Sequence, residues 1–125
     1  MIQKILTDQA PLPAGHYSQA IVSNGLVFVA GQLPITADKV RHSDAPVAEQ
    51  AEIVLHNIQA ILKAAGSDKS KLLQVTVYIT DIEHWGAVNT VYAEFLGDHR
   101  PARAIVPVQE LHYGLQIEMQ AVACL

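Results

Sequence analysis

The chain has 125 residues, half of them hydrophobic, and a net charge of −4 from 12 acidic and 8 basic residues. This length predicts one domain spanning residues 1–125, and the apolar runs are far too short to cross a membrane. Lys and Arg form no run, so no nucleic-acid partner is expected. Only 16% of the residues are charged. This apolar composition predicts that part of the protein surface is buried between subunits. The single cysteine, Cys124, cannot form an intramolecular disulfide, so we expect a reducing, cytoplasmic environment.

The first third of the chain is typical of short strands. A short strand over 3–6 is followed by a loop over 10–15, which contains two prolines and a glycine. A strand over 17–22 then leads into Asn24-Gly25, a pair typical of two-residue hairpin turns because both residues tolerate positive φ. The apolar strand that follows, over 26–30, is expected to end at Gly31.

A long helix is predicted after a polar loop. It starts near Asp44, has Pro46 in its first turn, where proline is tolerated, and ends at Gly66. Apolar residues recur at helical spacing along it: Val47, Ala51, Val54, Leu55, Ile58, Ile61, Leu62 and Ala65.

Three strands and a second helix complete the predicted elements. The first of these strands, over 72–80, alternates, so that one set of side chains faces each side of the sheet: Leu73, Val75, Val77 and Ile79 against Gln74, Thr76, Tyr78 and Thr80. Asp81 caps the second helix, with Glu83 in its first turn, and Gly97 ends it. Its buried stripe is Trp85, Val88, Tyr92 and Phe95. The last two strands are expected over 102–108 and 115–124.

This order predicts an α+β domain in which one mixed sheet carries both helices on one face. Two helices cover only one face of such a sheet, yet the strands over 26–30 and 104–106 are apolar on both faces. A second copy of the chain is therefore expected to cover the other face.

The last two predicted strands each carry a charged residue among apolar ones. Its alternation points Leu115, Ile117, Met119 and Ala121 to the helices and Gln116, Glu118 and Gln120 to the other face. Burying a carboxylate on a covered face costs free energy, so such a residue is expected to be paired with a cation or to take part in the function. Arg103 in the preceding apolar strand also needs an anion, so the sequence predicts one Arg and one Glu on adjacent strands.

Two interpretations of this pair are open. The structural one is a salt bridge between Arg103 and Glu118 at a subunit interface. In the functional one, Arg103 holds a substrate carboxylate through two parallel hydrogen bonds, and Glu118 orients or deprotonates a water molecule.

Several segments along nearly the whole chain resemble the RidA (YjgF-like) family. Pro101-Ala102-Arg103 followed by Leu115-Gln116-Ile117-Glu118-Met119 is similar to its C-terminal signature. The other matching segments are Gly15-His16-Tyr17-Ser18-Gln19-Ala20, Ala30-Gly31-Gln32-Leu33-Pro34, 57–66, Val75-Thr76-Val77-Tyr78 with Asp81, and Val88-Asn89-Thr90-Val91-Tyr92. Together these segments are specific to the family, whereas each segment alone is weak evidence for it.

The resemblance implies a chorismate-mutase-like fold and a homotrimer whose sheets face a central barrel, with pockets between subunits. It implies hydrolysis of 2-aminoacrylate-type enamines and 2-imino acids, such as 2-iminobutyrate and 2-iminopropionate, to 2-oxo acids and ammonia, without a cofactor. Arg103 matches the arginine that binds the carboxylate and Glu118 the glutamate that positions water. Tyr17, the backbone around Gly31, and Asn89 match pocket residues.

Three positions depart from the family pattern. Ile105 stands where a cysteine is common, two residues after the arginine, so only its backbone is a candidate substrate contact. His16 replaces a proline before Tyr17 and adds a group that can titrate beside the pocket. Ala30 replaces a serine and removes a hydroxyl. These changes bear on substrate preference more than on reaction type.

Other features are assigned structural roles. The six histidines lack ligand spacing on any one element, so no metal site is expected. Tyr78, Tyr92 and Trp85 are expected to be packing residues, and Cys124 an inert thiol. Two other functions stay open: a non-catalytic regulatory trimer that binds small carboxylates, and a ribonuclease or translation inhibitor, which the acidic charge disfavours.

Overall fold

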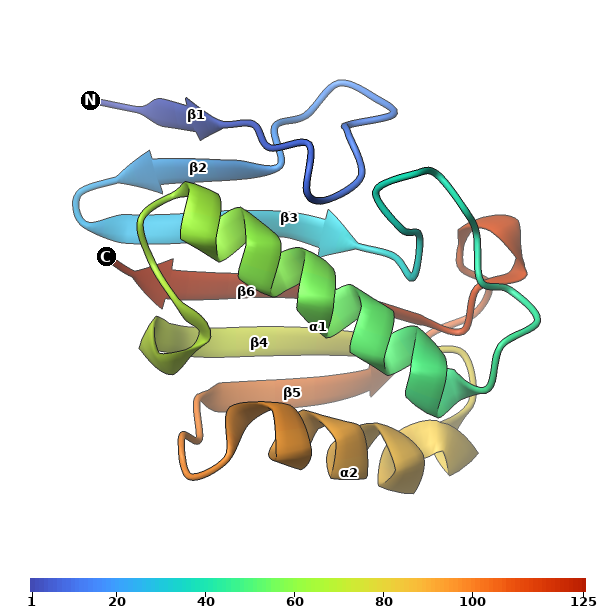
Figure 1. Cartoon of the computed structure of the whole chain (residues 1–125). Coiled ribbons are helices and arrows are strands. Elements are labelled where there is room, and N and C mark those ends of the chain that lie inside the picture. The colour runs from blue at the N-terminus through green and yellow to red at the C-terminus, as the bar shows by residue number, and fades with distance from the viewer.

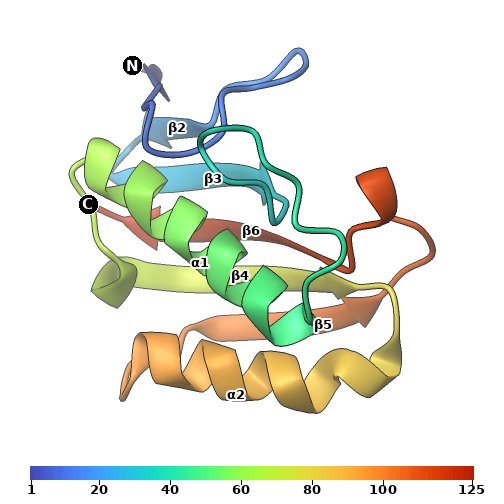
Figure 2. The same cartoon turned by 45° about the vertical axis from the view of Figure 1, so that its right-hand side comes forward.

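The computed structural model describes all residues from 1 to 125. Six strands form one mixed sheet in the order β1-β2-β3-β6-β4-β5, and both α-helices lie on the same face of it (Figure 1). The turned view in Figure 2 shows the helices as a second layer, with nothing covering the opposite face. The elements are β1 (Gln3–Ile5), β2 (Ala20–Ser23), β3 (Leu26–Gln32), α1 (Val47–Ala64), η1 (Lys69–Lys71), β4 (Leu72–Ile79), η2 (Ile82–His84), α2 (Trp85–Leu96), β5 (Ala102–Pro107), η3 (His112–Gly114) and β6 (Ile117–Cys124). The predicted α+β arrangement is confirmed.

The predicted hairpin joins β2 to β3. Asn24 and Gly25 have φ values of 53° and 76°, the left-handed conformations that a tight two-residue turn needs. The strand prediction from residue 17 was wrong at its start, because Tyr17 donates its backbone N–H to Gly15 in a turn and β2 begins only at Ala20. β3 also continues past its predicted end through Gly31 to Gln32, with a shift in its pairing to β6 that absorbs the irregular backbone.

The long helix buries the predicted apolar stripe against the sheet. From Val47 to Leu62 every predicted position is in the core, and Ala65 packs against it. Pro46 caps the helix in an extended conformation, with ψ of 150°, rather than lying in its first turn. Gly66, at φ 85°, ends it as predicted. None of the helices is long and apolar enough to cross a membrane.

The second helix begins four residues after its predicted cap. Asp81 caps the short η2 turn, its carboxylate accepting the Glu83 backbone N–H at 2.9 Å, and α2 follows from Trp85. α2 links β4 to the parallel strand β5, so it lies over that edge of the sheet. Trp85, predicted to be core, is 43% exposed because it is the first residue of α2 and lies beyond the core that Val88 and Tyr92 enter.

One residue of β4 faces the opposite side from its prediction. A shift in the pairing of β4 with β6 between Leu72 and Gln74 buries Leu72 and leaves Leu73 46% exposed. From Val75 to Ile79 the predicted alternation holds, with Val75, Val77 and Ile79 buried under the helices.

The face without helices is apolar as well. Phe28 and Leu73 are each 46% exposed there, and Val106 is 38% exposed. Polar side chains share this face only in part, including Gln120 and the half-buried Glu118. A single chain therefore leaves large hydrophobic side chains in water, as expected for a surface that a partner covers.

Candidate functional site

The two predicted charged residues lie on strands that are not adjacent. β4 lies between β5 and β6 in the sheet, so the expectation of neighbouring strands was wrong. Arg103 pairs with Val75, which is buried under the helices, whereas Glu118 pairs with Tyr78 on the opposite face. Because paired residues share a face of the sheet, the two side chains point to opposite faces. A salt bridge between them could form only between two chains.

Arg103 is held between β5 and α2. Its Nη1 donates to the Asn89 Oδ1 at 2.8 Å, and its guanidinium carbon lies 4.8 Å from the centre of the Tyr92 ring and 5.7 Å from that of Trp85. This one hydrogen bond engages one of the five N–H donors of an arginine. The half-buried cation has no acidic partner within the chain, so its fork is free to bind an anion.

Three residues of α2 surround this arginine because they share one helix face. Trp85, Asn89 and Tyr92 follow each other at spacings of four and three residues. The Tyr92 hydroxyl is buried and has no hydrogen-bond partner. Burial raises the pKa of Tyr92, and the Arg103 charge acts against it. The sequence interpretation assigned both aromatic residues to packing and missed their contact with Arg103, which their spacing from Asn89 could have indicated.

Glu118 lies on the opposite face, against the backbone of β3. A Cβ atom added to Gly31 would overlap the Glu118 Oε2 oxygen, so the carboxylate occupies the space that a side chain at residue 31 would take. Burial raises the pKa of Glu118, and the positive charge of His112 lowers it. A half-buried carboxylate with a raised pKa has the character of a general base or acid.

This contact makes Gly31→Ala a test of the position of Glu118. The added methyl should push the carboxylate aside, since the overlapping atom is the end of a flexible side chain. We expect a folded protein with a displaced carboxylate, and a displacement of about 1 Å is enough to lower the rate of a reaction that Glu118 catalyses about tenfold to hundredfold. The matched control is Gly86→Ala in α2, where a Cβ meets nothing within 4 Å. Equal activity in both variants would mean that Glu118 needs no fixed position.

The remaining predicted residues are placed as follows. Tyr17 is 52% exposed in the loop before β2, where its hydroxyl accepts the Ala14 N–H at 3.4 Å. Ile105 lies on the helix face with Arg103 and packs against the core. Gln116 was wrongly assigned to the open face: it precedes β6, and its side-chain oxygen accepts from the Gln50 Nε2 of α1 at 3.3 Å.

The structure thus brings the predicted residues together in two groups. Arg103 meets Asn89 under α2, and Glu118 meets Gly31 on the open face. The histidines join no group of three or more His, Cys, Asp or Glu side chains that could hold a metal ion. The site therefore offers an arginine with no acidic partner in the chain and a carboxylate of raised pKa, on opposite faces of one sheet.

Comparisons with known proteins find similar sequences that extend over nearly the whole chain. Residues 7–125 match the family model described as Endoribonuclease L-PSP. A RutC family protein from Sinorhizobium fredii is 44% identical over 125 residues, covering 100% of this chain and 99% of the relative. The rat 2-iminobutanoate/2-iminopropanoate deaminase is 36% identical, covering 98% of this chain and 90% of its own.

Solved structures show the same fold. RidA from the Antarctic bacterium Psychrobacter superposes with a TM-score of 0.92 at 34% identity, covering 98% of this chain and 99% of that one. E. coli TdcF with bound serine gives a TM-score of 0.93 at 32% identity, covering 98% of each chain. The match of sequence and fold over nearly the full length shows that this chain belongs to the Endoribonuclease L-PSP family, which includes the YjgF, RutC and RidA proteins.

Proposed function

We propose that the protein hydrolyses 2-aminoacrylate-type enamines and 2-imino acids, including 2-iminobutyrate and 2-iminopropionate, to 2-oxo acids and ammonia. The observation that carries this proposal is Arg103, a half-buried guanidinium held by Asn89 at 2.8 Å with no acid beside it. Such a cation is stabilised by a carboxylate ligand, and 2-imino acids carry one. The deaminase name of the rat relative supports the reaction type.

The proposed mechanism divides the work between the two charged residues. Arg103 binds the substrate carboxylate with two hydrogen bonds and so fixes the position of the imine carbon. Glu118 takes a proton from water as the water oxygen bonds to the imine carbon, and the imine nitrogen takes a proton from solvent. The resulting carbinolamine releases its hydroxyl proton to solvent as the C–N bond breaks, and the nitrogen leaves as ammonia with the proton that Glu118 returns.

We also propose a homotrimer whose open sheet faces meet and whose sites lie at the boundaries between copies, where Arg103 on the edge strand β5 of one copy and Glu118 of another share one site. The apolar side chains on the open face, including Phe28 and Val106, support burial against other copies. The opposite directions of Arg103 and Glu118 support a shared site, because one chain cannot present both groups to one small substrate.

A second candidate function is a regulatory trimer that binds small carboxylates without catalysis. The structure of TdcF with bound serine supports the presence of a carboxylate-binding pocket in this fold. Glu118 distinguishes the two functions, since an acid near a bound anion costs affinity unless it takes part in a reaction. A ribonuclease is disfavoured by the net charge of −4, and it would require RNA binding that weakens steeply with salt.

The test couples a pyridoxal-phosphate threonine dehydratase to this protein and follows 2-oxobutyrate formation, with semicarbazide competing for the imine. We expect the protein to restore oxo-acid formation in proportion to its concentration. An unchanged background rate with both 2-iminobutyrate and 2-iminopropionate would overturn the proposal. In that case, serine or 2-oxo acid binding measured by calorimetry would support the regulatory function. RNA binding that weakens with salt would support the ribonuclease function.

A further inference from the structure

We propose that Trp85, the first residue of α2, is a specificity-determining residue: its indole receives the side chain of a substrate whose carboxylate binds Arg103, and it favours 2-imino acids with large apolar side chains. This inference rests on the proposed hydrolase function and names the substrate class that the site prefers. Three observations carry it: the contact of the indole with Arg103, the direction from which solvent reaches that arginine, and the apolar surface around it.

The indole of Trp85 lies against the guanidinium that would bind the ligand. Its ring centre is 5.7 Å from the Arg103 guanidinium carbon, and Asn89 engages only one of the guanidinium N–H groups. A carboxylate bound by an arginine fork has its oxygens about 2.8 Å from the guanidinium nitrogens. The α carbon and side chain of such a ligand therefore lie close to the same indole ring.

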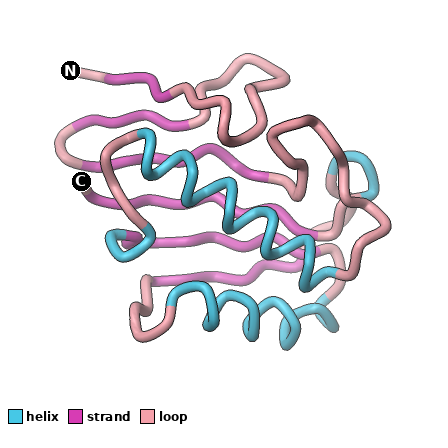
Figure 3. The backbone as a smooth tube through the Cα atoms, viewed as in Figure 1, coloured by secondary structure: helices cyan, strands magenta, loops and turns pink.

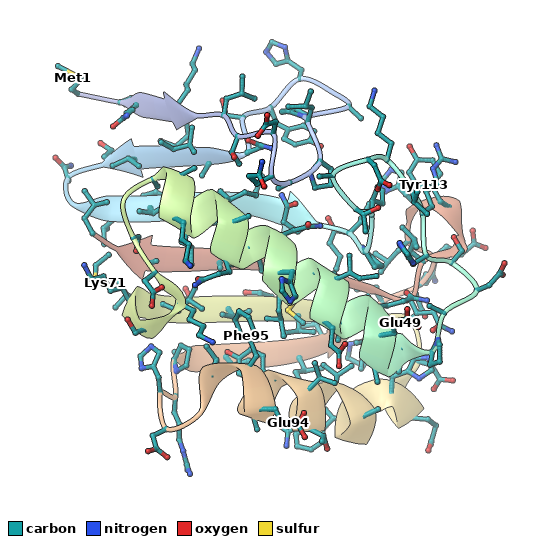
Figure 4. The ribbon with its side chains drawn as sticks, in the orientation of Figure 1. Met1, Glu49, Lys71, Glu94, Phe95 and Tyr113 are labelled. Atoms are coloured by element: carbon teal, nitrogen blue, oxygen red, sulfur yellow. The ribbon has the colours of Figure 1, made fainter.

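Exposure along α2 indicates that Arg103 is reached from the Trp85 end of the helix. Trp85 is 43% exposed, whereas Tyr92, later in the helix and beside the same arginine, is 6% exposed. The far end of α2 is closed, because Phe95 packs against the core and its carbonyl accepts the Lys69 Nζ at 2.9 Å. Figure 4 labels Phe95 in this later part of the helix. A ligand therefore approaches Arg103 past the indole.

A second apolar residue lies toward the same end. α2 links the end of β4 to the start of the parallel strand β5, so it runs antiparallel to both strands, and its first turn lies toward the end of β5 (Figure 3). Ile105 follows Arg103 in that direction, on the same face of β5, and is only partly buried. Trp85 and Ile105 thus both present apolar surface on the side of Arg103 that faces the start of α2.

The face of α2 that carries Trp85 has no charged side chain. Glu94 is the only charged residue from Trp85 to Leu96. At about 3.6 residues per turn, its position puts it on the opposite side of the helix from Trp85, where it is exposed. Next to Trp85, a Cβ atom on Gly86 would meet nothing within 4 Å, so the chain leaves space beside the indole. α2 therefore offers the side chain of a ligand apolar contact without charge.

These surroundings favour one class of side chain. The methyl group of 2-iminopropionate is too small to cover an indole, whereas the side chains of the imines of leucine and phenylalanine bury much more apolar surface against it. One added methylene in an apolar pocket changes kcat/KM about tenfold or more. A carboxylate side chain, as in the imine of glutamate, would lose water beside the indole without gaining a partner.

The experiment measures kcat/KM for the 2-imino acids that a flavin-dependent amino-acid oxidase forms from alanine, leucine, phenylalanine and glutamate, with semicarbazide as the competing trap. It compares wild type, Trp85→Ala, Trp85→Phe and Ile82→Ala. Ile82 is an exposed apolar residue of η2, just before α2, and its variant is the matched control. Melting temperatures and sedimentation check the fold and the assembly of each variant.

We expect wild type to hydrolyse the leucine and phenylalanine imines about tenfold better than the alanine imine, and the glutamate imine worst. Trp85→Ala should lower kcat/KM for the two large apolar imines about tenfold and that for the alanine imine less than about threefold. Trp85→Phe should keep most of the preference, since it keeps an aromatic ring. Ile82→Ala should leave the preference unchanged.

Fluorescence gives a second readout, because Trp85 is the only tryptophan in the chain. The 2-oxo acid of leucine should change the emission of Trp85 and bind about tenfold more tightly than pyruvate. Arg103→Ala should abolish the change, since the ligand then loses its carboxylate partner. This titration of the intact protein requires no turnover.

Two results would overturn the inference. One is an equal loss for all four imines in Trp85→Ala, since the indole would then act only by holding Arg103. The other is a preference among the imines that Trp85→Ala leaves unchanged. If wild type hydrolyses no imine, the proposed function fails, and the fluorescence titration still decides whether Trp85 contacts the side chain of a bound carboxylate.

Discussion

Arg103→Ala is expected to lower kcat/KM for 2-imino acids by about two to three orders of magnitude, toward the uncatalysed background. Truncating one side of a buried, hydrogen-bonded charge pair costs about 2–5 kcal/mol, and here the lost partner is the substrate carboxylate. Arg103→Lys keeps the charge but not the planar fork, so it should recover only part of the loss. The coupled dehydratase assay, with circular dichroism and sedimentation to check fold and assembly, measures the effect.

A mixing experiment tests whether each site draws on two copies. Arg103→Ala and Glu118→Ala variants, each inactive alone, are unfolded together and refolded as mixed oligomers. If Arg103 and Glu118 come from different copies, half of the copies supply each intact group, and about one quarter of the sites regain both. Mixed oligomers as inactive as the two parents would mean that both groups of a site come from one chain. Simple mixing without refolding is the control.

Glu118→Gln is expected to abolish hydrolysis and at the same time to stabilise the fold at neutral pH. Burial raises the pKa of Glu118 in the folded state, so the folded protein holds a proton that the unfolded chain releases first. The free energy of unfolding therefore falls as pH rises from the unfolded pKa to the folded one, and it stays lower above that range. Glutamine removes this penalty.

At pH 7 the free energy of unfolding of Glu118→Gln should exceed that of wild type by at most about 1 kcal/mol, because the half-exposed carboxylate keeps part of its water. The melting temperature should rise by about 2–5 °C. Below about pH 4, where the carboxyl is protonated in both states, the gain should vanish. Thermal unfolding between pH 3.5 and 8 measures it, with Glu94→Gln at an exposed position of α2 as the control. A variant less stable than wild type at pH 7 would contradict the burial argument.

The sequence by itself predicted the elements and the surfaces that the fold must bury. The helical spacing from Val47 to Leu62 could be satisfied only by a helix with one buried stripe, and the alternation from Val75 to Ile79 only by a strand with one covered face. Asn24-Gly25 specified its turn because few residue pairs tolerate two left-handed conformations. These are local properties, so a single sequence expresses them. Strand ends and the side that Leu73 faces depended instead on pairing partners.

The arrangement of the candidate site was decided by the tertiary structure. Arg103 and Glu118 were identified as charged residues in apolar strands, but nothing local indicates that β4 lies between those strands and turns the two side chains to opposite faces. Trp85 and Tyr92 carry the spacing of packing residues, and the position of α2 over β5 brings their rings to Arg103. Hydrophobic periodicity specifies what must be buried, whereas strand order and long-range contacts determine which functional groups meet.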